Sequence, residues 1–227
     1  NINIAISASK EYLPYSKVMM SSLIKLHPKT KVNFFVFYLD STVSNFKNEF
    51  LKIVKSNNQK NEIKFIKVGY DQVKLVDNNK GWAIDLWARW YLLDYLKDEC
   101  DRILILGVDT LIKGNLKDFY FQNLRGYYFA CCSDMFINNS ESIKWPTIKN
   151  DMERFNFKDK SKYINGDVVL VNLKETRNKL SFNKFLKTYY KHQFTCWDQD
   201  TISYCFNDKI KFQDYLFYNY FPNLNLD

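Results

Sequence analysis

One carboxylate in this sequence occupies a position from which it could do chemistry. Asp109 lies just after the expected strand 102–106, whose last four residues, ILIL, form an apolar run typical of a strand buried on both faces. A carboxylate delivered to the end of such a strand needs a metal ion, a hydrogen-bond donor or solvent. The structural alternative is that Asp109 caps a turn. Because ligands of open α/β sheets bind beyond the carboxyl ends of the strands, residues 7–12 and 107–110 are the first candidates for a site.

The apolar patterns on either side of Asp109 predict the elements that must position it. Strands are expected at 2–7, 31–39, 62–68 and 102–106, and helices at 14–26, 42–54 and 85–97. This alternation predicts an α/β fold with a mostly parallel central sheet flanked by helices. In the second half we expect strands at 127–132, 168–172 and 209–212, and helices at 182–191 and 198–206.

No linker divides the chain, so one domain over residues 1–227 is expected. Its first half, 1–112, has the α/β pattern, and its second half, 113–227, has a mixed α+β pattern.

The composition is that of a folded, aromatic-rich and basic chain. The 227 residues include 33 Lys and Arg against 25 Asp and Glu, a formal charge of +8, with only 6 Gly and 4 Pro. Disordered and collagen-like proteins are thereby excluded. The charge favours an anionic partner: a nucleic acid, a membrane surface or a phosphorylated small molecule. The lysines are scattered and no nucleic-acid-binding motif occurs, so no nucleic acid is expected, and peripheral membrane association stays open.

The lack of a visible targeting signal and the spacing of the cysteines both favour a cytoplasmic location. No apolar run reaches the ~18 residues of a membrane helix, and no signal peptide is visible. The five cysteines contain no Cys-x-x-Cys pair, and the two histidines have no cysteine partners at zinc-finger spacing. We therefore expect reduced thiols and a cytoplasmic location.

Five short segments follow one another in a recognisable order and spacing. They are IAISASKEY at 4–12, WARWY at 87–91, DRILILGVDTLIKGNL at 101–116, YINGDVVLVNL at 163–173 and DQD at 198–200. Together they resemble the retaining glycosyltransferases of family 8, which include glycogenin and bacterial lipooligosaccharide galactosyltransferases. Gly107 replaces the first aspartate of the family's Asp-x-Asp motif, Ser9 replaces an aspartate, and Asp167 stands where the family usually has glycine.

The resemblance implies a GT-A-like (Rossmann-like) fold and hexosyltransferase activity. It also implies that the half 1–112 binds the nucleotide and that the half 113–227 binds the acceptor. Such enzymes move a hexose from a nucleotide sugar, usually a UDP-sugar, to a hydroxyl group of a glycan or another acceptor. A divalent cation, Mn²⁺ or Mg²⁺, lies between the Asp-x-Asp carboxylates and the diphosphate, and oxygen ligands suit both ions. By this match, Asp109 is the metal-ligating carboxylate.

The resemblance also assigns the other site residues. Tyr12 matches a tyrosine that stacks on the base, and Arg89 matches an arginine near the phosphates and sugar. Asp198 and Gln199 match the residues nearest the reacting carbon. The weakly basic amide of Gln199 favours a front-face route over a double displacement. The further donor-binding residues are Ala8, Ser9, Gly107, Val108, Asp109, Asp134, Asn165, Gly166 and Asp167.

Several of these assignments have structural alternatives. Tyr12 could be a core or rim tyrosine, Arg89 could form a surface salt bridge, and Asp198 could be a helix N-cap. Asp134 matches an aspartate that often faces the sugars in the family, and a role in capping a turn or a helix N-terminus is an equal alternative. Asp167 could contact sugar hydroxyls or block the pocket.

One family segment, which carries a metal-ligating histidine and a phosphate-binding lysine, has no match in this sequence. Either the protein continues past residue 227, the donor phosphates help to hold the metal, or catalysis is lost. The alternative functions are a catalytically impaired nucleotide-sugar-binding domain and, with less support, a nucleic-acid-binding protein. Acceptor selectivity is expected in 135–162, where Trp145 and Phe155 could stack on sugars or pack in the core.

Overall fold

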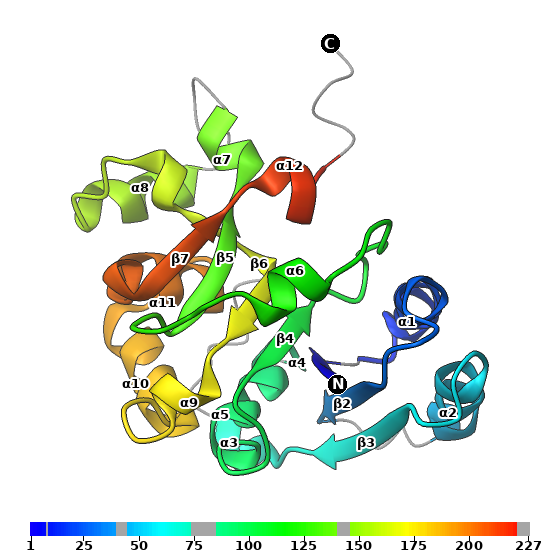
Figure 1. Ribbon diagram of the computed structural model, residues 1–227. Coiled ribbons are helices and arrows are strands. Elements are labelled where there is room, and N and C mark those ends of the chain that lie inside the picture. The colour runs from blue at the N-terminus through cyan, green and yellow to red at the C-terminus, as the bar shows by residue number, and fades with distance from the viewer. Residues whose placement is uncertain (8, 40–44, 74–84, 140–145, 222–227) are drawn as a thin grey trace.

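A computed structural model describes residues 1–7, 9–39, 45–73, 85–139 and 146–221 (Figure 1). Its centre is a seven-stranded sheet in the order β3-β2-β1-β4-β6-β5-β7. The strands are β1 (Ile2–Ser7), β2 (Val32–Tyr38), β3 (Glu62–Lys67), β4 (Ile103–Leu106), β5 (Phe129–Ser133), β6 (Ile164–Val171) and β7 (Ile210–Gln213). Strand β6 is antiparallel to β4 and β5, and the other described pairs are parallel. The expected mostly parallel sheet is therefore confirmed.

Helices cover both faces of this sheet, as the alternating pattern predicts (Figure 1). One face carries α1 (Leu13–Leu26), α2 (Lys47–Lys55) and α6 (Lys117–Phe121). The other face carries α4 (Asp85–Ala88), α5 (Leu92–Tyr95), α10 (Phe182–His192) and α11 (Trp197–Cys205). The further α-helices are α3 (Tyr70–Val73), α7 (Met135–Asn139), α8 (Pro146–Arg154), α9 (Leu173–Thr176) and α12 (Tyr215–Tyr218). Among the described residues, no helix combines the length and apolarity needed to cross a bilayer.

Strand β4 is buried on both faces because its side chains alternate between two apolar clusters. Ile103 and Ile105 belong to the cluster that includes α10 and α11. Leu104 and Leu106 belong to the cluster that includes α1 and α6. None of the four is more than 1% exposed, so the strand that leads to Asp109 lies in a rigid framework.

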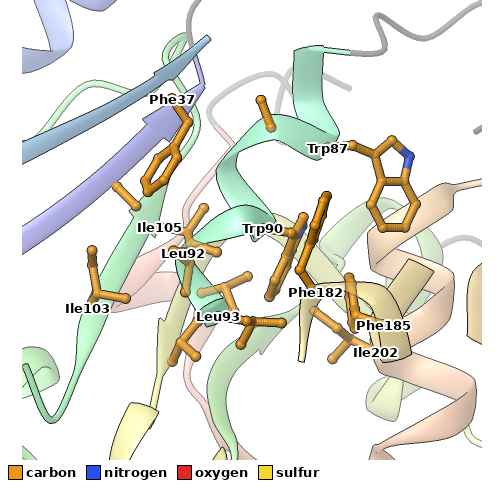
Figure 2. Packing of buried hydrophobic residues seen from close by; sticks show 14 of the residues in the cluster. Phe37, Trp87, Trp90, Leu92, Leu93, Ile103, Ile105, Phe182, Phe185 and Ile202 are labelled. Atoms are coloured by element: carbon orange, nitrogen blue, oxygen red, sulfur yellow. The ribbon is translucent and has the colours of Figure 1, made fainter. Parts of the chain in front are cut away.

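Aromatic side chains fill the space between the sheet and α10. Trp90 packs against Phe185 with ring centroids 4.5 Å apart, and it meets Phe129 edge to face at 6.1 Å. Figure 2 shows Trp90 and Phe185 among the aliphatic side chains of this cluster. Burial of such large rings stabilises the position of the chain around Trp90, and therefore that of Arg89 beside it.

The helix expected over 85–97 is present over 85–95, but its middle turn is tighter than an α-helix. α4 continues directly into a 3₁₀ turn (Arg89–Tyr91) and then into α5. Within this turn the adjacent Arg89 and Trp90 are both buried, at 4% and 0% exposed.

Strand β6 begins earlier than the expected range 168–172. It starts at Ile164, so Asn165, Gly166 and Asp167 are strand residues rather than loop residues. The other strands, together with α1, α10 and α11, begin and end within two residues of their predicted bounds. Part of the predicted helix 42–54 lies outside the described residues.

The five cysteines are free thiols. Burial raises the pKa of Cys100 to about 11 and the pKa of Cys131 well above its ordinary value. These two thiols are therefore protonated and unreactive at neutral pH.

Candidate functional site

The candidate site lies at the carboxyl end of β4. Because β6 is antiparallel to β4, with Leu106 opposite Val168, the residues that precede Val168 lie beside those that follow Leu106. The N–H of Gly107 donates to the carbonyl oxygen of Asp167 at 2.7 Å. The hydroxyl of Thr110 donates to the carbonyl oxygen of Gly107 at 2.7 Å and closes the turn. Residues 107–110 and 165–167 are thus brought together by the pairing of two strands.

Two carboxylates lie beside Gly107. A Cβ atom built on Gly107 would lie 2.8 Å from Oδ1 of Asp167 and 3.1 Å from Oδ1 of Asp109. Burial, together with the negative charge of Asp109, raises the pKa of Asp167 to about 6. Carboxylate oxygens are the ligands that Mg²⁺ and Mn²⁺ prefer, so the donor set fits the divalent cation that the resemblance implies.

Two carboxylates are few protein ligands for a metal site. Within the described ranges, no group of three or more His, Cys, Asp or Glu side chains could hold a metal ion. Magnesium-type sites often combine one or two carboxylates with the phosphate oxygens of a substrate. Asp109 and Asp167 therefore suit a cation that arrives with a phosphate-bearing ligand.

A buried ion pair joins the 3₁₀ turn to α11. Nη2 of Arg89 donates to Oδ2 of Asp198 at 2.8 Å and to the carbonyl oxygen of Gly166 at 3.3 Å. Nε1 of Trp90 donates to the same Oδ2 at 2.6 Å. Arg89 and Asp198 are 4% and 9% exposed, so this is not the surface salt bridge considered for Arg89. At this burial the two charges depend on each other for compensation.

Asp198 is not the N-cap of α11. The helix begins at Trp197, and Cys196 is its N-cap. Oδ1 of Asp198 accepts the N–H of Gln199 at 3.0 Å, while Oδ2 is engaged by the ion pair. The N-cap alternative was wrong because the helix starts one residue before Asp198.

Two hydrogen bonds hold the side-chain amide of Gln199 in one orientation. Its Oε1 accepts the N–H of Gly166 at 2.9 Å, and its Nε2 donates to Oδ2 of Asp134 at 3.3 Å. A carbonyl oxygen has two lone pairs, so Oε1 retains acceptor capacity for a ligand.

Asp134 caps a helix, which is one of the roles considered for it. Its Oδ1 accepts the N–H groups of Phe136 and Ile137 at 3.0 and 3.1 Å and caps α7. Its Oδ2 accepts Nδ2 of Asn165 at 3.2 Å as well as the amide of Gln199. Burial raises the pKa of Asp134. The cap of α7 is therefore connected directly to the polar network of the site.

Two residues of this network, Trp90 and Asn219, are not identified by the sequence analysis. Trp90 follows Arg89 directly, and the need of a buried indole N–H for an acceptor could have suggested its role. Nδ2 of Asn219 donates to Oδ1 of Asn165 at 2.8 Å, and Asn219 is 9% exposed. No local pattern marks Asn219, because the chain brings it to the site only after β7.

The carboxyl end of β1 lies at the same edge of the sheet, since β1 is parallel to β4. Tyr12 is 45% exposed, so it is not a core residue, and its ring centroid is 5.9 Å from that of Tyr15. Ser9 is buried, and its carbonyl oxygen accepts the N–H of Tyr12 at 3.2 Å. Val108 is half-buried against the α1 cluster. Ala8 lies outside the described residues.

The expected acceptor segment is only partly described. Phe155 stacks on Tyr204 and packs against Phe194, in both cases with ring centroids 5.0 Å apart. Packing is therefore the interpretation that the structure favours for Phe155. Trp145 lies outside the described residues.

Comparison with known proteins places the chain among glycosyltransferases. The sequence profile of glycosyl transferase family 8 matches residues 3–226. Over 214 residues the chain is 26% identical to a Haemophilus influenzae protein named as a glycosyltransferase. Over 216 residues it is 23% identical to the lipopolysaccharide 1,3-galactosyltransferase of Salmonella typhimurium. Both matches cover 93% of this chain and 61% of the relative, so the chain spans about three fifths of the length of these relatives.

The fold also matches a solved structure. The crystal structure of the galactosyltransferase LgtC with donor and acceptor sugar analogues superimposes with a TM-score of 0.75 at 22% identity. The match covers 94% of this chain and 74% of that one. At this identity the likeness shows the fold alone, and it confirms the expected GT-A-like architecture.

Proposed function

The chain belongs to glycosyl transferase family 8, and on this premise we propose that it transfers a hexose from UDP to a glycan hydroxyl with retention of configuration. The observation that carries the proposal is the buried polar network at the end of β4. In this network the Arg89–Asp198 ion pair, Gln199 and Asp134 surround the first residues of β6. Such a network offers fixed charges and hydrogen-bonding groups to a sugar.

The proposed nucleotide site lies in residues 1–112. The exposed ring of Tyr12 stacks on the base, and the hydroxyl of Ser9 bonds to the edge of the base. Asp109 would hold Mn²⁺ or Mg²⁺ at the diphosphate end of the donor. When bound, this cation offsets the negative charge of the leaving diphosphate.

The proposed sugar site combines both halves of the chain. Asp134 and Asn165, from 113–227, offer a carboxylate and an amide to the sugar hydroxyls. Arg89, from the first half, fixes the position of Asp198 in the second half. The two halves share one sheet, so we treat them as parts of one domain with a donor side and an acceptor side.

The proposed reaction follows a front-face route. The bond from the anomeric carbon to the phosphate oxygen breaks while the bond to the acceptor oxygen forms on the same face of the sugar. The acceptor proton passes to the departing phosphate oxygen. The positive charge that develops on the sugar ring faces Oε1 of Gln199 and the carboxylate of Asp198. Because Arg89 and Trp90 hold Asp198 in place beforehand, little reorganisation is needed during the reaction.

The direct test is release of UDP. With Mn²⁺, a saccharide of the lipopolysaccharide type and either UDP-glucose or UDP-galactose, we expect UDP release that stops on addition of EDTA. The name of the Salmonella relative guides the choice of acceptor. NMR of the product should show the anomeric configuration of the donor. Absence of UDP release with both donors, together with no UDP binding by calorimetry, would contradict the proposal.

Base stacking gives a second prediction. Tyr12→Ala should raise the KM for the donor about tenfold with little change in kcat, since stacking on a base is worth about 1–3 kcal/mol. Tyr15→Ala is the matched control, because Tyr15 is 56% exposed and its ring neighbours that of Tyr12. Steady-state kinetics with varied donor measures both variants. An unchanged KM in Tyr12→Ala would exclude a role of this ring in donor binding.

One observation favours a second candidate function, a nucleotide-sugar-binding domain without turnover. Gly107 has no side chain with which to bind a metal, and no cluster of three ligating side chains occurs in the described part of the chain. This candidate predicts that UDP-sugars bind with the same affinity in the presence and absence of EDTA, and that no UDP is released.

A further inference from the structure

Two neighbouring positions differ from the pattern that the family resemblance implies. Position 107, at the end of β4, is glycine where the resemblance implies aspartate, and position 167, on β6, is aspartate where it implies glycine. The N–H of Gly107 donates to the carbonyl oxygen of Asp167 at 2.7 Å, so the two positions lie side by side. The carboxylate missing from one strand is therefore present on the adjacent strand.

We infer that Asp167 replaces the missing aspartate as the second carboxylate ligand of a divalent cation, together with Asp109. This inference rests on the proposed function, in which the diphosphate of a nucleotide sugar supplies the remaining ligands. It assigns Asp167 to the cation rather than to a sugar hydroxyl.

The geometry beside Gly107 supports this assignment. A Cβ atom built there would lie 2.8 Å from Oδ1 of Asp167 and 3.1 Å from Oδ1 of Asp109. The carboxylate of Asp167 therefore lies next to the space that a side chain at position 107 would occupy. A Cβ atom essentially never approaches an oxygen as closely as 2.8 Å, so an aspartate at 107 would require Asp167 to move. Glycine at 107 and aspartate at 167 thus form one consistent arrangement.

The bonding of Asp167 is also that of a side chain available to a ligand. Asp167 is half-buried, and no hydrogen bond or ion pair from another described residue reaches its carboxylate. The charges that act on it are those of Asp109, Asp134, Asp198 and the guanidinium of Arg89. Arg89 is bound to Asp198, so the site has an excess of negative charge that a divalent cation would offset.

The inference is tested by Mn²⁺ binding, measured by electron paramagnetic resonance and calorimetry on the full chain with saturating UDP. We expect Asp167→Asn to weaken Mn²⁺ binding by about 10–100-fold. Asp167→Gly should have the same effect. In the double variant Gly107→Asp/Asp167→Gly the carboxylate returns to β4, and binding should recover to within about threefold of wild type. Thermal unfolding of each variant shows whether it is folded.

Asp208→Asn is the matched control, because Asp208 is exposed and pairs with Lys209 at 3.2 Å. It precedes β7, so it lies at the amino end of that strand, whereas the proposed site lies at the carboxyl end of β4. It should bind Mn²⁺ like wild type. Three outcomes would overturn the inference: no Mn²⁺ binding by wild type with UDP, wild-type affinity in Asp167→Asn, or a folded double variant that binds no better than Asp167→Gly.

Failure of the proposed function has a different signature. If Mn²⁺ binding depends on Asp167 but no hexose donor releases UDP, the cation site is supported and the proposed transferase activity is refuted. If UDP is released but Mn²⁺ binds equally well without the carboxylate of Asp167, the transferase activity is supported and the role of Asp167 as a cation ligand is refuted.

Discussion

Replacement of Asp198 by asparagine is expected to lower kcat for hexose transfer by about 10²–10³-fold. Asparagine keeps an oxygen that can accept from Arg89 and Trp90, so the geometry is retained while the negative charge is lost. In the proposed reaction this charge faces the positive charge that develops on the sugar. Since the ground state gains little from it, the effect should fall on kcat rather than on the donor KM.

The same change should also cost stability. Arg89 is 4% exposed, and removal of the charge of one partner from a buried ion pair typically costs about 3–5 kcal/mol. The hydrogen bonds that remain in Asp198→Asn place the expected cost at the lower end of this range. Kinetics must therefore be measured below the thermal midpoint of the variant, which circular dichroism determines.

Asp151→Asn separates the loss of catalysis from the loss of stability. Asp151 is 7% exposed, pairs with Arg154 at 2.8 Å and accepts the N–H of Thr195 at 2.9 Å. It is thus a buried aspartate with an arginine partner outside the network around Asp198. Because it lies in the expected acceptor segment 135–162, the two variants are compared at saturating acceptor. We expect this control to lose stability while kcat stays within about threefold of wild type. Equal losses of kcat in the two variants would reduce the role of Asp198 to a structural one.

The position of Asp109 at the end of a buried strand could be predicted because it follows from the neighbouring residues in the sequence. The run Ile103–Leu106 is apolar at every position, and only a strand covered on both faces accommodates such a run. A turn in which the N–H of Thr110 donates to the carbonyl oxygen of Gly107 follows this run, and Asp109 lies in that turn. The burial of Ile105 and Leu106 in two different clusters agrees with this local argument.

The ion pair could not be predicted in the same way. Arg89 and Asp198 are 109 residues apart, and the bond between them forms only when α11 packs beside the 3₁₀ turn. The local pattern of 85–97 is helical, and it carries no sign that two adjacent side chains turn inward. The resemblance brought both residues into the site, but it did not indicate that they bind each other.

The pairing of β6 with β4 also could not be predicted from the sequence. The apolar residues 168–171 predict a strand, but not its direction or its neighbour. Only the antiparallel pairing of these strands brings Asp167 beside Gly107. Two positions that look independent in the sequence, 107 and 167, therefore lie side by side in space.

Loss of the carboxylate of Asp109 should have the largest effect on donor use. Asp109→Asn keeps the size of the side chain but removes the negative charge that binds a cation, and charge stabilisation by a metal is worth several kcal/mol. We therefore expect kcat/KM to fall about 10³-fold, with a higher Mn²⁺ concentration required for half-maximal rate. UDP release at varied Mn²⁺ measures both quantities.

Asp101→Asn is the control for this prediction, because Asp101 precedes the same strand at its other end. Asp101 is exposed and pairs with Arg177 at 3.5 Å, so its replacement should leave both the rate and the Mn²⁺ requirement unchanged. If Asp109→Asn retained the Mn²⁺ requirement of wild type, the cation would not be bound by Asp109. If its activity fell at an unchanged Mn²⁺ requirement, Asp109 would act on the sugar or the acceptor instead of the diphosphate.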